Sequence, residues 1–349
     1  MSVKEFYSRT ILQRTKALMT MKTAVAGAIL IFIACALTNL FYFFPQTSVA
    51  ELGHILTNYN PDNLIHHVTL TIKLPRLIGA VMVGAMLAVG GAVMQGITRN
   101  YLASPDVVGV DSGAGLGLSI AMALTGGATS YWSSITFSML GAACAMGVIF
   151  FVSSRIRGNE SSIKLLLAGS ALGMMFSGIA KTIDIASGMG QSINVWNNSG
   201  LLGIQWVAIG VLLLGISGMA LGFAIAGRIT VLGMGDETAV SLGQNVRLTK
   251  LLGIASVVLI SSATVCTVGN IGFVGLVIPN MVKMAVGEDY RKVIPLSALF
   301  GSLLLMAADV ASRLVNYPAE TPIGTITSIL GIPIFLYLIN SKRHKGGLE

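Results

Sequence analysis

Charged residues are scarce in this sequence: Asp, Glu, Lys and Arg together make up 10% of its 349 residues. Soluble globular domains carry roughly 25% charged residues, so the composition excludes an ordinary soluble domain. Hydrophobic residues account for 54% of the chain, and the mean hydropathy is +0.80. We therefore expect a protein embedded in a lipid bilayer.

Motifs for metal binding are missing as well. The three cysteines each lie inside an apolar run without a CxxC pair, and are expected to be small buried hydrophobic residues. His54, His66 and His67 have no neighbouring Cys and no HExxH pattern, and are expected in a solvated loop. We predict no metal site and no cofactor held by this chain.

Sequence patterns for nucleotide and covalent chemistry are absent too. No GxxxxGK[ST] segment occurs, so any ATP hydrolysis must take place on another chain. The chain also lacks GxSxG and a grouped serine, histidine and carboxylate, which leaves an intramembrane enzyme little support. The net charge is +8, but the basic residues form no stripe interleaved with aromatic residues. A nucleic-acid partner is therefore not expected.

Apolar runs of roughly 20 residues, the length that crosses a bilayer, are abundant. Ten such runs, some of them shorter, cover residues 24–44, 68–97, 107–125, 133–153, 163–186, 202–226, 249–267, 272–286, 293–311 and 321–340. The first run lacks a small-x-small cleavage site and is too long for a signal-peptide core, so it is read as an uncleaved helix. The sequence predicts an all-α polytopic membrane protein with ten transmembrane helices.

The positive charges orient these helices. With the N-terminus in the cytoplasm, all but four of the 22 Lys and Arg residues fall on the inner side, the exceptions being Lys73, Arg76, Lys181 and Arg313. The positive-inside rule selects this orientation, with both termini cytoplasmic. We expect a cytoplasmic N-terminal segment at 1–23, a transmembrane domain at 24–340 with a cytoplasmic loop at about 228–250, and a cytoplasmic tail at 341–349.

Small residues and helix breakers pattern the apolar runs. A small residue stands at every fourth position from Ala80 to Gly96, which places these residues on one helix face and favours close packing in lipid. Glycine and proline interrupt other runs, as in "VGNIGFVGLVIPN" and "ETPIGTITSILGIPIF". Broken helices are tolerated where they line a cavity, so the pattern favours a transport pathway over a purely structural bundle.

The few charges near the outer ends of the predicted helices are informative. Asp309 and Arg313 stand four residues apart and can pair, and Lys181 and Asp184 are expected to pair in the same way. The remaining outer cations suit either docking of an acidic partner or snorkelling to lipid phosphates. Buried carboxylates are too few to favour coupling to an ion gradient.

Eight ordered blocks resemble the FecCD family of ABC-importer permeases, which carry iron–siderophores, haem and cobalamin. The blocks begin near residue 68 and comprise "LPRLIGAVMVGAMLAVGGAVMQ", "RNYLASPDVVGV", "LLLAGSALG", "ETAVSLGQ", "GFVGLVIPN", "GEDYRKVIPLSALFG", "ADVASRL" and "ETPIGTITSILGIPIFLYLI". The segments "GITRNYLASP" and "SRLVNYPAETPIG" are most similar to Gram-positive ferric siderophore permeases.

This resemblance implies a type II ABC importer permease fold in the cytoplasmic membrane. It implies two permease subunits, either two copies of this chain or this chain and a paralogue. Two cytoplasmic ATPase subunits would hold ATP and Mg²⁺, and an extracytoplasmic substrate-binding protein, expected to be a lipoprotein, would deliver the cargo. The chain itself would perform no covalent chemistry.

The resemblance also assigns roles to particular residues. The family's docking positions for the binding protein match Lys73, Arg76 and Arg313, which favours docking over snorkelling. Its ATPase-coupling helix matches the segment that contains Asp236, Glu237, Ala239, Leu242 and Gly243. The same loop has helical spacing, and Gly243 is placed to end a short helix.

The family's inner gate matches Ser161 and Ser162, although hydroxyl residues at a helix start are also ordinary N-caps. Two positions depart from the family pattern: Asn280 stands where many members have His, and Asp111 where Asn or Ser is common. Asp111 bears on the lining of the pathway and hence on the substrate.

The sequence therefore predicts the membrane-spanning permease of an ABC importer for ferric siderophores that works by alternating access. A haem or cobalamin permease of the same family is the nearest alternative. An ion-coupled secondary transporter, an intramembrane enzyme and a structural scaffold remain weaker alternatives.

Overall fold

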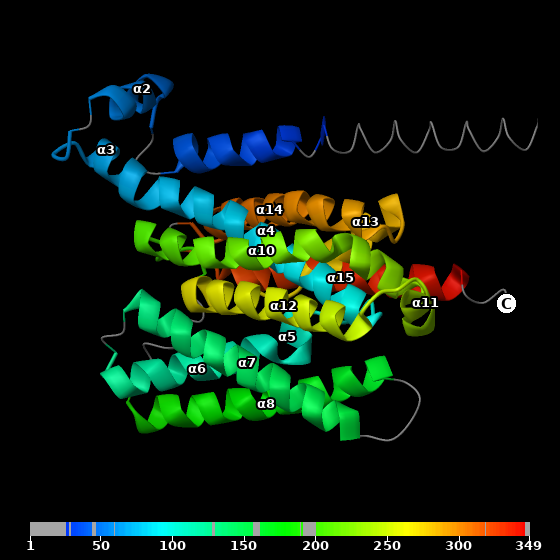
Figure 1. Cartoon of the computed structure of the whole chain (residues 1–349). Coiled ribbons are helices and arrows are strands. Elements are labelled where there is room, and N and C mark those ends of the chain that lie inside the picture. The colour runs from blue at the N-terminus through cyan, green and yellow to red at the C-terminus, as the bar shows by residue number, and fades with distance from the viewer. Residues whose placement is uncertain are drawn as a thin grey trace, which may run out of the picture.

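The computed structural model describes residues 26–27, 29–43, 47–58, 60–127, 130–155, 161–188, 190, 200–317 and 319–345. Within these residues the regular structure is helical throughout, with no β-strand. The long helices run side by side in one bundle (Figure 1). The chain is therefore all-α over its described part, as predicted.

A helix occupies each of the ten predicted ranges. The first of them lies at Ile29–Tyr42 and ends in the π-helix η1 (Thr38–Tyr42). The others are α4 (Leu74–Thr98), α6 (Val110–Thr125), α7 (Tyr131–Arg155), α8 (Ser161–Ala186), α10 (Trp206–Gly233), α12 (Val246–Val268), α13 (Val274–Val286), α14 (Tyr290–Leu314) and α15 (Ile323–Lys345). The predicted order of helices is thus found, with boundaries shifted by several residues.

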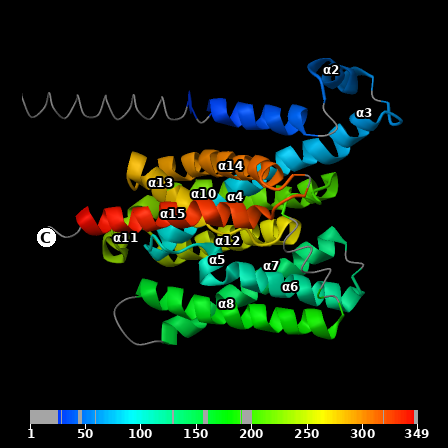
Figure 2. The same ribbon diagram turned by 180° about the vertical axis from the view of Figure 1, so that it is seen from behind.

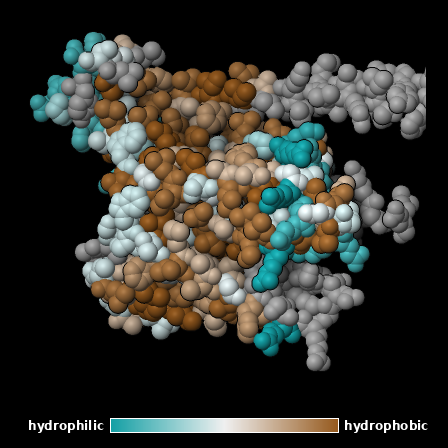
Figure 3. Space-filling model, viewed as in Figure 1, coloured by the Kyte–Doolittle hydropathy of each residue, from teal (hydrophilic) through white to brown (hydrophobic). Residues whose placement is uncertain are grey.

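Five segments among the described residues are long and apolar enough to cross a membrane: Leu64–Thr98, Trp132–Ile149, Trp206–Gly233, Val246–Val268 and Tyr290–Leu314. Shorter apolar helices include Val110–Thr125 and Val274–Val286. That all ten helices span the bilayer therefore stays a prediction. Figure 3 shows a largely hydrophobic middle on the visible face, with hydrophilic residues gathered toward the two ends.

Short helices lie at both ends of the bundle. At one end, α2 (Val49–Thr57), α3 (Leu64–Val68) and the π-helix η2 (Thr69–Lys73) precede α4. At the opposite end, α11 (Asp236–Ser241) lies near the C-terminal part of α15, as both views show (Figures 1 and 2). These are called the α3 end and the α11 end below.

Two minor sequence predictions were wrong. The three histidines lie in α2 and α3 rather than in a loop. His66 is buried, and its Nδ1 accepts a hydrogen bond from the Asn60 amide at 3.2 Å. Of the cysteines, Cys266 is buried but Cys144 is exposed. Cys144 lies on α7, where Leu140 and Phe151 are also exposed, and such a face suits lipid contact.

Helix α4 is the centre of the bundle. It packs against α10, α12, α13 and α14, and the small residues from Ala80 to Gly96 are buried as predicted. A Cβ atom added to Gly84 would overlap the Gly301 carbonyl of α14, and one added to Gly91 would overlap the Gly275 carbonyl of α13. Glycine is thus required at both positions, because the backbones of neighbouring helices meet there.

The predicted interruption between the apolar runs at 249–267 and 272–286 is also found. Helix α12 ends at Val268, and α13 begins at Val274. Between them, Gly269 and the non-glycine residue Phe273 have φ values of 72° and 70°. A positive φ is strained for Phe, so the packing around this connection must hold it in place.

We expect Gly91→Ala to destabilise the protein by about 1–3 kcal/mol, because the methyl group cannot fit without separating α4 from α13. The measurement is the thermal unfolding midpoint of the purified protein in detergent. Gly147→Ala on α7 is the control, since nothing lies within 4 Å of its added Cβ. Equal midpoints for both variants would contradict the close contact described here.

Candidate functional site

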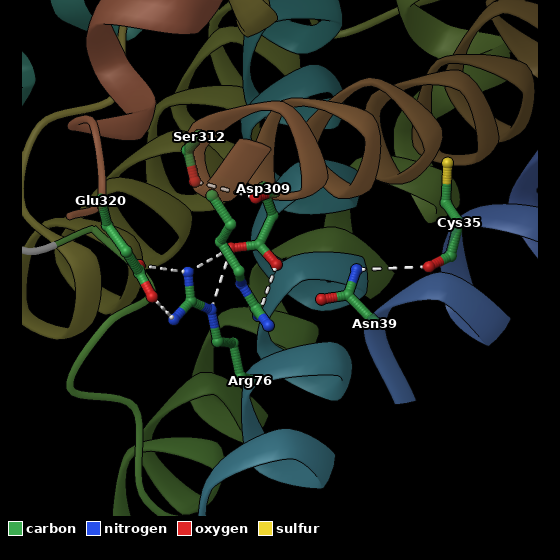
Figure 4. A network of polar contacts seen from close by, with 7 residues as sticks. Cys35, Asn39, Arg76, Asp309, Ser312 and Glu320 are labelled. Carbon is green, nitrogen blue, oxygen red and sulfur yellow. Dashed lines mark hydrogen bonds and ion pairs between the residues drawn. The ribbon is translucent and has the colours of Figure 1, made fainter. Parts of the chain in front are cut away.

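Arg76 lies at the centre of an ionic cluster at the α3 end, which we call the Arg76 cluster (Arg76, Asp309, Arg313 and Glu320; Figure 4). Nε and Nη2 of Arg76 donate to Asp309 Oδ1 at 2.9 and 2.8 Å. Its Nη1 and Nη2 donate to Glu320 Oε1 and Oε2 at 3.0 and 2.7 Å. Figure 4 shows the guanidinium held between the two carboxylates.

The other half of the cluster comes from α14. Arg313 Nη2 donates to Asp309 Oδ2 at 2.9 Å, which is the pair that the spacing of four residues predicted. Arg313 also lies over the Phe43 ring, with Cζ 4.5 Å from the ring centroid. Asp309 is fully buried, and bridges two arginines from helices α4 and α14.

Lys73 lies beside this cluster and is also buried. Its Nζ donates to the Leu40 carbonyl at 2.9 Å and to Thr47 Oγ1 at 3.1 Å. The sequence predicts Arg76 to be an outer cation with no carboxylate partner of its own. This prediction was wrong, because Arg76 has two carboxylate partners.

This arrangement has three physical consequences. Removing one partner of a buried ion pair typically costs about 3–5 kcal/mol, so the cluster also fastens α4 to α14. Lys73 together with the cluster has three positive and two negative groups, which leaves one net positive charge. Glu320 is the partly exposed carboxylate, with 30% of its side chain accessible, and therefore covers Arg76 on the solvent side.

Helix α11 forms the second candidate site, at the α11 end. Asp236 at its first turn pairs with Lys250 Nζ at 2.9 Å and with Arg99 Nη2 at 3.3 Å. Ala239 is fully buried, and Gly243 just beyond the helix has a φ of 79°, as expected for a residue that ends a helix. The loop is therefore a fixed structure joined to the ends of α4 and α12.

The outward face of α11 is apolar. Val240 and Leu242 are 61% and 64% exposed, and Met234, just before the helix, is 69% exposed. Ala239 and Leu242 are three residues apart, but the structure separates them: Ala239 is buried, whereas Leu242 is the C-cap and is exposed. Glu237 is exposed on the same segment. Large apolar side chains grouped on a polar loop are typical of a protein interface.

A cavity of about 780 Å³ forms the third candidate site. It is lined by the N-terminal part of α6, the C-terminal half of α8, the last turn of α12, the connection that follows α12 and the first two turns of α15. Its charged lining residues are Asp106, Asp111, Lys181 and Asp184. Asp106 lies in the short helix α5 (Pro105–Val108) and accepts a hydrogen bond from Ser104 Oγ.

Two carboxylates of this cavity each have one oxygen atom without a partner. Asp111 is 4% exposed and Asp184 is 8% exposed, and Oδ1 of each has no hydrogen-bond partner. The predicted pair between Lys181 and Asp184 does not form among the described residues of α8. Both side chains line the cavity instead of meeting each other.

The remaining predicted pathway residues do not line this cavity or have side chains outside the described part of the chain. Asn280 is buried on α13, and its Nδ2 donates to the carbonyl oxygens of Tyr101 and Leu276, both at 2.8 Å. It is absent from the lining of the cavity that contains Asp111. Ser161 and Ser162 form the start of α8, and their side chains lie outside the described part of the chain.

Sequence reasoning missed a buried polar contact that joins α4 and α13. Lys283 Nζ donates to Gln95 Oε1 at 2.7 Å, and lies 5.2 and 5.1 Å from the ring centroids of Tyr101 and Tyr290. Tyr101 in turn donates a hydrogen bond to Glu288, which raises the pKa of its phenol to about 12. No local motif signals this contact, because its members are far apart in sequence.

No three His, Cys, Asp or Glu side chains within the described ranges lie close enough together to hold a metal ion. The described sites thus consist of a charged cluster, an apolar loop surface and a polar cavity. Such features suit binding and movement.

Comparison with known proteins gives a consistent result. A model of the FecCD transport family matches residues 13–341. The iron(3+)-hydroxamate import system permease protein of Bacillus subtilis is 39% identical, over 92% of this chain and 85% of its own length. The hemin transport system permease protein of Yersinia pestis is 37% identical, over 83% of this chain and 88% of its own.

The arrangement of helices has a counterpart among solved structures. A metal-chelate type ABC transporter in an inward-facing conformation has a TM-score of 0.75 and 26% sequence identity. The match covers 92% of this chain and 99% of that chain. A second permease of Bacillus subtilis, from an Fe(3+)-citrate import system, is 38% identical over 78% of this chain and 81% of its own length.

Proposed function

Because the chain belongs to the FecCD transport family, we propose that it is the permease subunit of an ABC importer for ferric siderophores. The observation that carries the proposal is the match along nearly its whole length to a permease for iron(3+)-hydroxamate import. The cavity between α6, α8, α12 and α15 provides a wall for the cargo's path. ATP and Mg²⁺ would bind to separate ATPase subunits.

A haem or cobalamin permease is the second candidate. The similarity to a hemin transport permease supports it, since the same fold serves more than one iron chelate. An ion-coupled transporter has less support, because its proton or sodium pathway would require more intramembrane carboxylates than the cavity offers.

We propose that all ten helices cross the cytoplasmic membrane, with both termini in the cytoplasm. Lys73 and the Arg76 cluster would then face outward at the α3 end, and α11 would face the cytoplasm. The positive-inside count supports this orientation, and so does the position of the two candidate sites at opposite ends of the bundle (Figure 1).

Transport would follow in three steps. The loaded binding protein docks at the α3 end, and the cargo enters between this subunit and a second permease subunit. The ATPases contact the apolar face formed by Met234, Val240 and Leu242, and their closure rocks the permease subunits. In alternating access, this chain would position the cargo and gate its path, and would perform no covalent chemistry. Ser161 and Ser162 remain the proposed inner gate.

The buried geometry refines how docking would occur. Arg76 is covered by Glu320, so an acidic group of the binding protein would have to take the place of that carboxylate. Exchange of one carboxylate for another costs little, because the guanidinium stays paired throughout. Lys73 and Arg313 would contribute the net positive charge that attracts the partner.

Cells that lack only this chain are expected to lose uptake of iron from at least one class of ferric siderophore, and the wild-type gene should restore it. The measurement is accumulation of labelled iron from hydroxamate and catecholate siderophores, with labelled haem and cobalamin in parallel. Loss confined to haem or cobalamin would replace the siderophore assignment with the second candidate. Uptake that depends on an ion gradient but not on ATP would reject the importer class.

Replacing Arg76 and Glu320 together with Gln is expected to weaken binding of the loaded binding protein at least about tenfold. The double change keeps the net charge of the cluster, and Arg313 still pairs with Asp309, so the fold should persist. The measurement is the Kd for the assembled permease–ATPase complex in nanodiscs. Lys292→Gln, an exposed cation change at the other end of α14, is the control, and an unaltered Kd for the double variant would reject docking through Arg76.

The variant Leu242→Asp is expected to abolish stimulation of ATPase activity by the loaded binding protein, because a carboxylate replaces an apolar contact. Leu242→Met keeps a similar apolar volume and should retain stimulation. Both are measured on the reconstituted complex, together with the amount of ATPase that copurifies. Full stimulation in the Asp variant would remove α11 from the coupling interface.

A further inference from the structure

The cavity lining carries an excess of negative charge. Asp106, Asp111 and Asp184 contribute three carboxylates, and Lys181 is the one basic residue among the lining residues of this cavity. The rest of its polar surface consists of neutral groups such as Ser119, Ser177 and Thr325. When ionised, the lining therefore has two net negative charges on this subunit.

One unsatisfied oxygen on each of two of these carboxylates points to a ligand. Asp111 and Asp184 are both more than nine-tenths buried, and Oδ1 of each is without a hydrogen-bond partner. A buried carboxylate oxygen that lacks a partner is costly, and this cavity wall holds two of them. A cargo with hydrogen-bond donors or positive charge would supply the missing partners.

We propose that this cavity is a charge-selective segment of the pathway that favours neutral and cationic ferric hydroxamates over anionic ferric chelates. The inference rests on the proposed function, and it names the chemical class of cargo. Three hydroxamate groups neutralise Fe(III), so the charge of such a chelate is set by its backbone substituents. Catecholate and citrate chelates retain negative charge, which the wall repels.

Lys181 limits the strength of this selection. It is exposed and lines the same cavity as Asp184, so it partly offsets the field of the carboxylates without forming an ion pair with them. A pathway must release its cargo, and moderate attraction serves that need better than a saturated binding site. Lys181 therefore weakens the preference for neutral and cationic cargo that Asp111 and Asp184 create.

The test uses one linear ferric trihydroxamate in three forms. Its terminal amine is left free, acetylated or succinylated, which gives chelates of charge +1, 0 and −1 with the same iron centre. Uptake of each is measured in cells that carry the complete importer, and is expressed relative to the neutral form in the same variant. Because the binding protein is unchanged, its own preference cancels when variants are compared.

Asp111→Asn and Asp184→Asn are each expected to raise the ratio of anionic to cationic uptake by about three- to tenfold, as suits one unit charge in a partly hydrated site. Lys181→Gln should lower that ratio. Asp184→Glu retains the charge and should keep the wild-type ratio. Asp62→Asn, which removes an exposed carboxylate outside the cavity lining, is the matched control.

Each outcome has a distinct meaning. Opposite shifts for the Asn variants and for Lys181→Gln, with none for the two controls, would support the charge-selective segment. An identical ratio in every variant that still imports the neutral chelate would overturn it while leaving the importer function intact. If the wild-type complex imports none of the three chelates, the proposed function fails for hydroxamates and this inference fails with it. Immunoblots of membrane fractions verify that each variant is present, and the two single Asn variants are scored independently.

Discussion

The close backbone approach of α4 to α13 and α14 is the constraint on which the other features depend. Helices in lipid gain little from hydrophobic burial against each other, so contact between small residues must hold them together. Gly84 meets Gly301, and Gly91 meets Gly275. These contacts set the distances at which Arg76 reaches Asp309 and Gln95 reaches Lys283. The ionic and polar contacts are therefore possible only because the glycines leave room.

Charge inside this bundle is used in two different ways. In the Arg76 cluster, each carboxylate has a cationic partner and each arginine has a carboxylate, so burial is balanced by pairing. In the cavity, Asp111 and Asp184 are buried without a partner for Oδ1. The first arrangement stabilises a fixed geometry. The second leaves unsatisfied acceptor oxygens, to which a passing molecule can donate hydrogen bonds.

The order and type of the helices could be predicted because length, hydropathy and spacing are local properties. The pair between Asp309 and Arg313 was predictable for the same reason, since four residues make one helical turn. The contact between Arg76 and Asp309 joins residues that are 233 positions apart, and no local pattern contains it. The failed pair between Lys181 and Asp184 shows the converse limit: helical spacing permits contact, but the adjoining cavity offers each side chain another direction.

Helix α4 carries Arg76 near its beginning and is followed directly by Arg99, the partner of Asp236. Its 25 residues give a length of about 37 Å at 1.5 Å per residue, comparable to the thickness of a membrane. Gly84 comes eight residues after Arg76, and Gly91 comes eight residues before Arg99, so the tightest contacts lie midway. The middle of α4 is therefore the part that neighbouring backbones hold most closely. If these central contacts stay fixed, a tilt that moves Arg76 sideways together with its partners moves Arg99, and with it the anchor of α11, in the opposite direction.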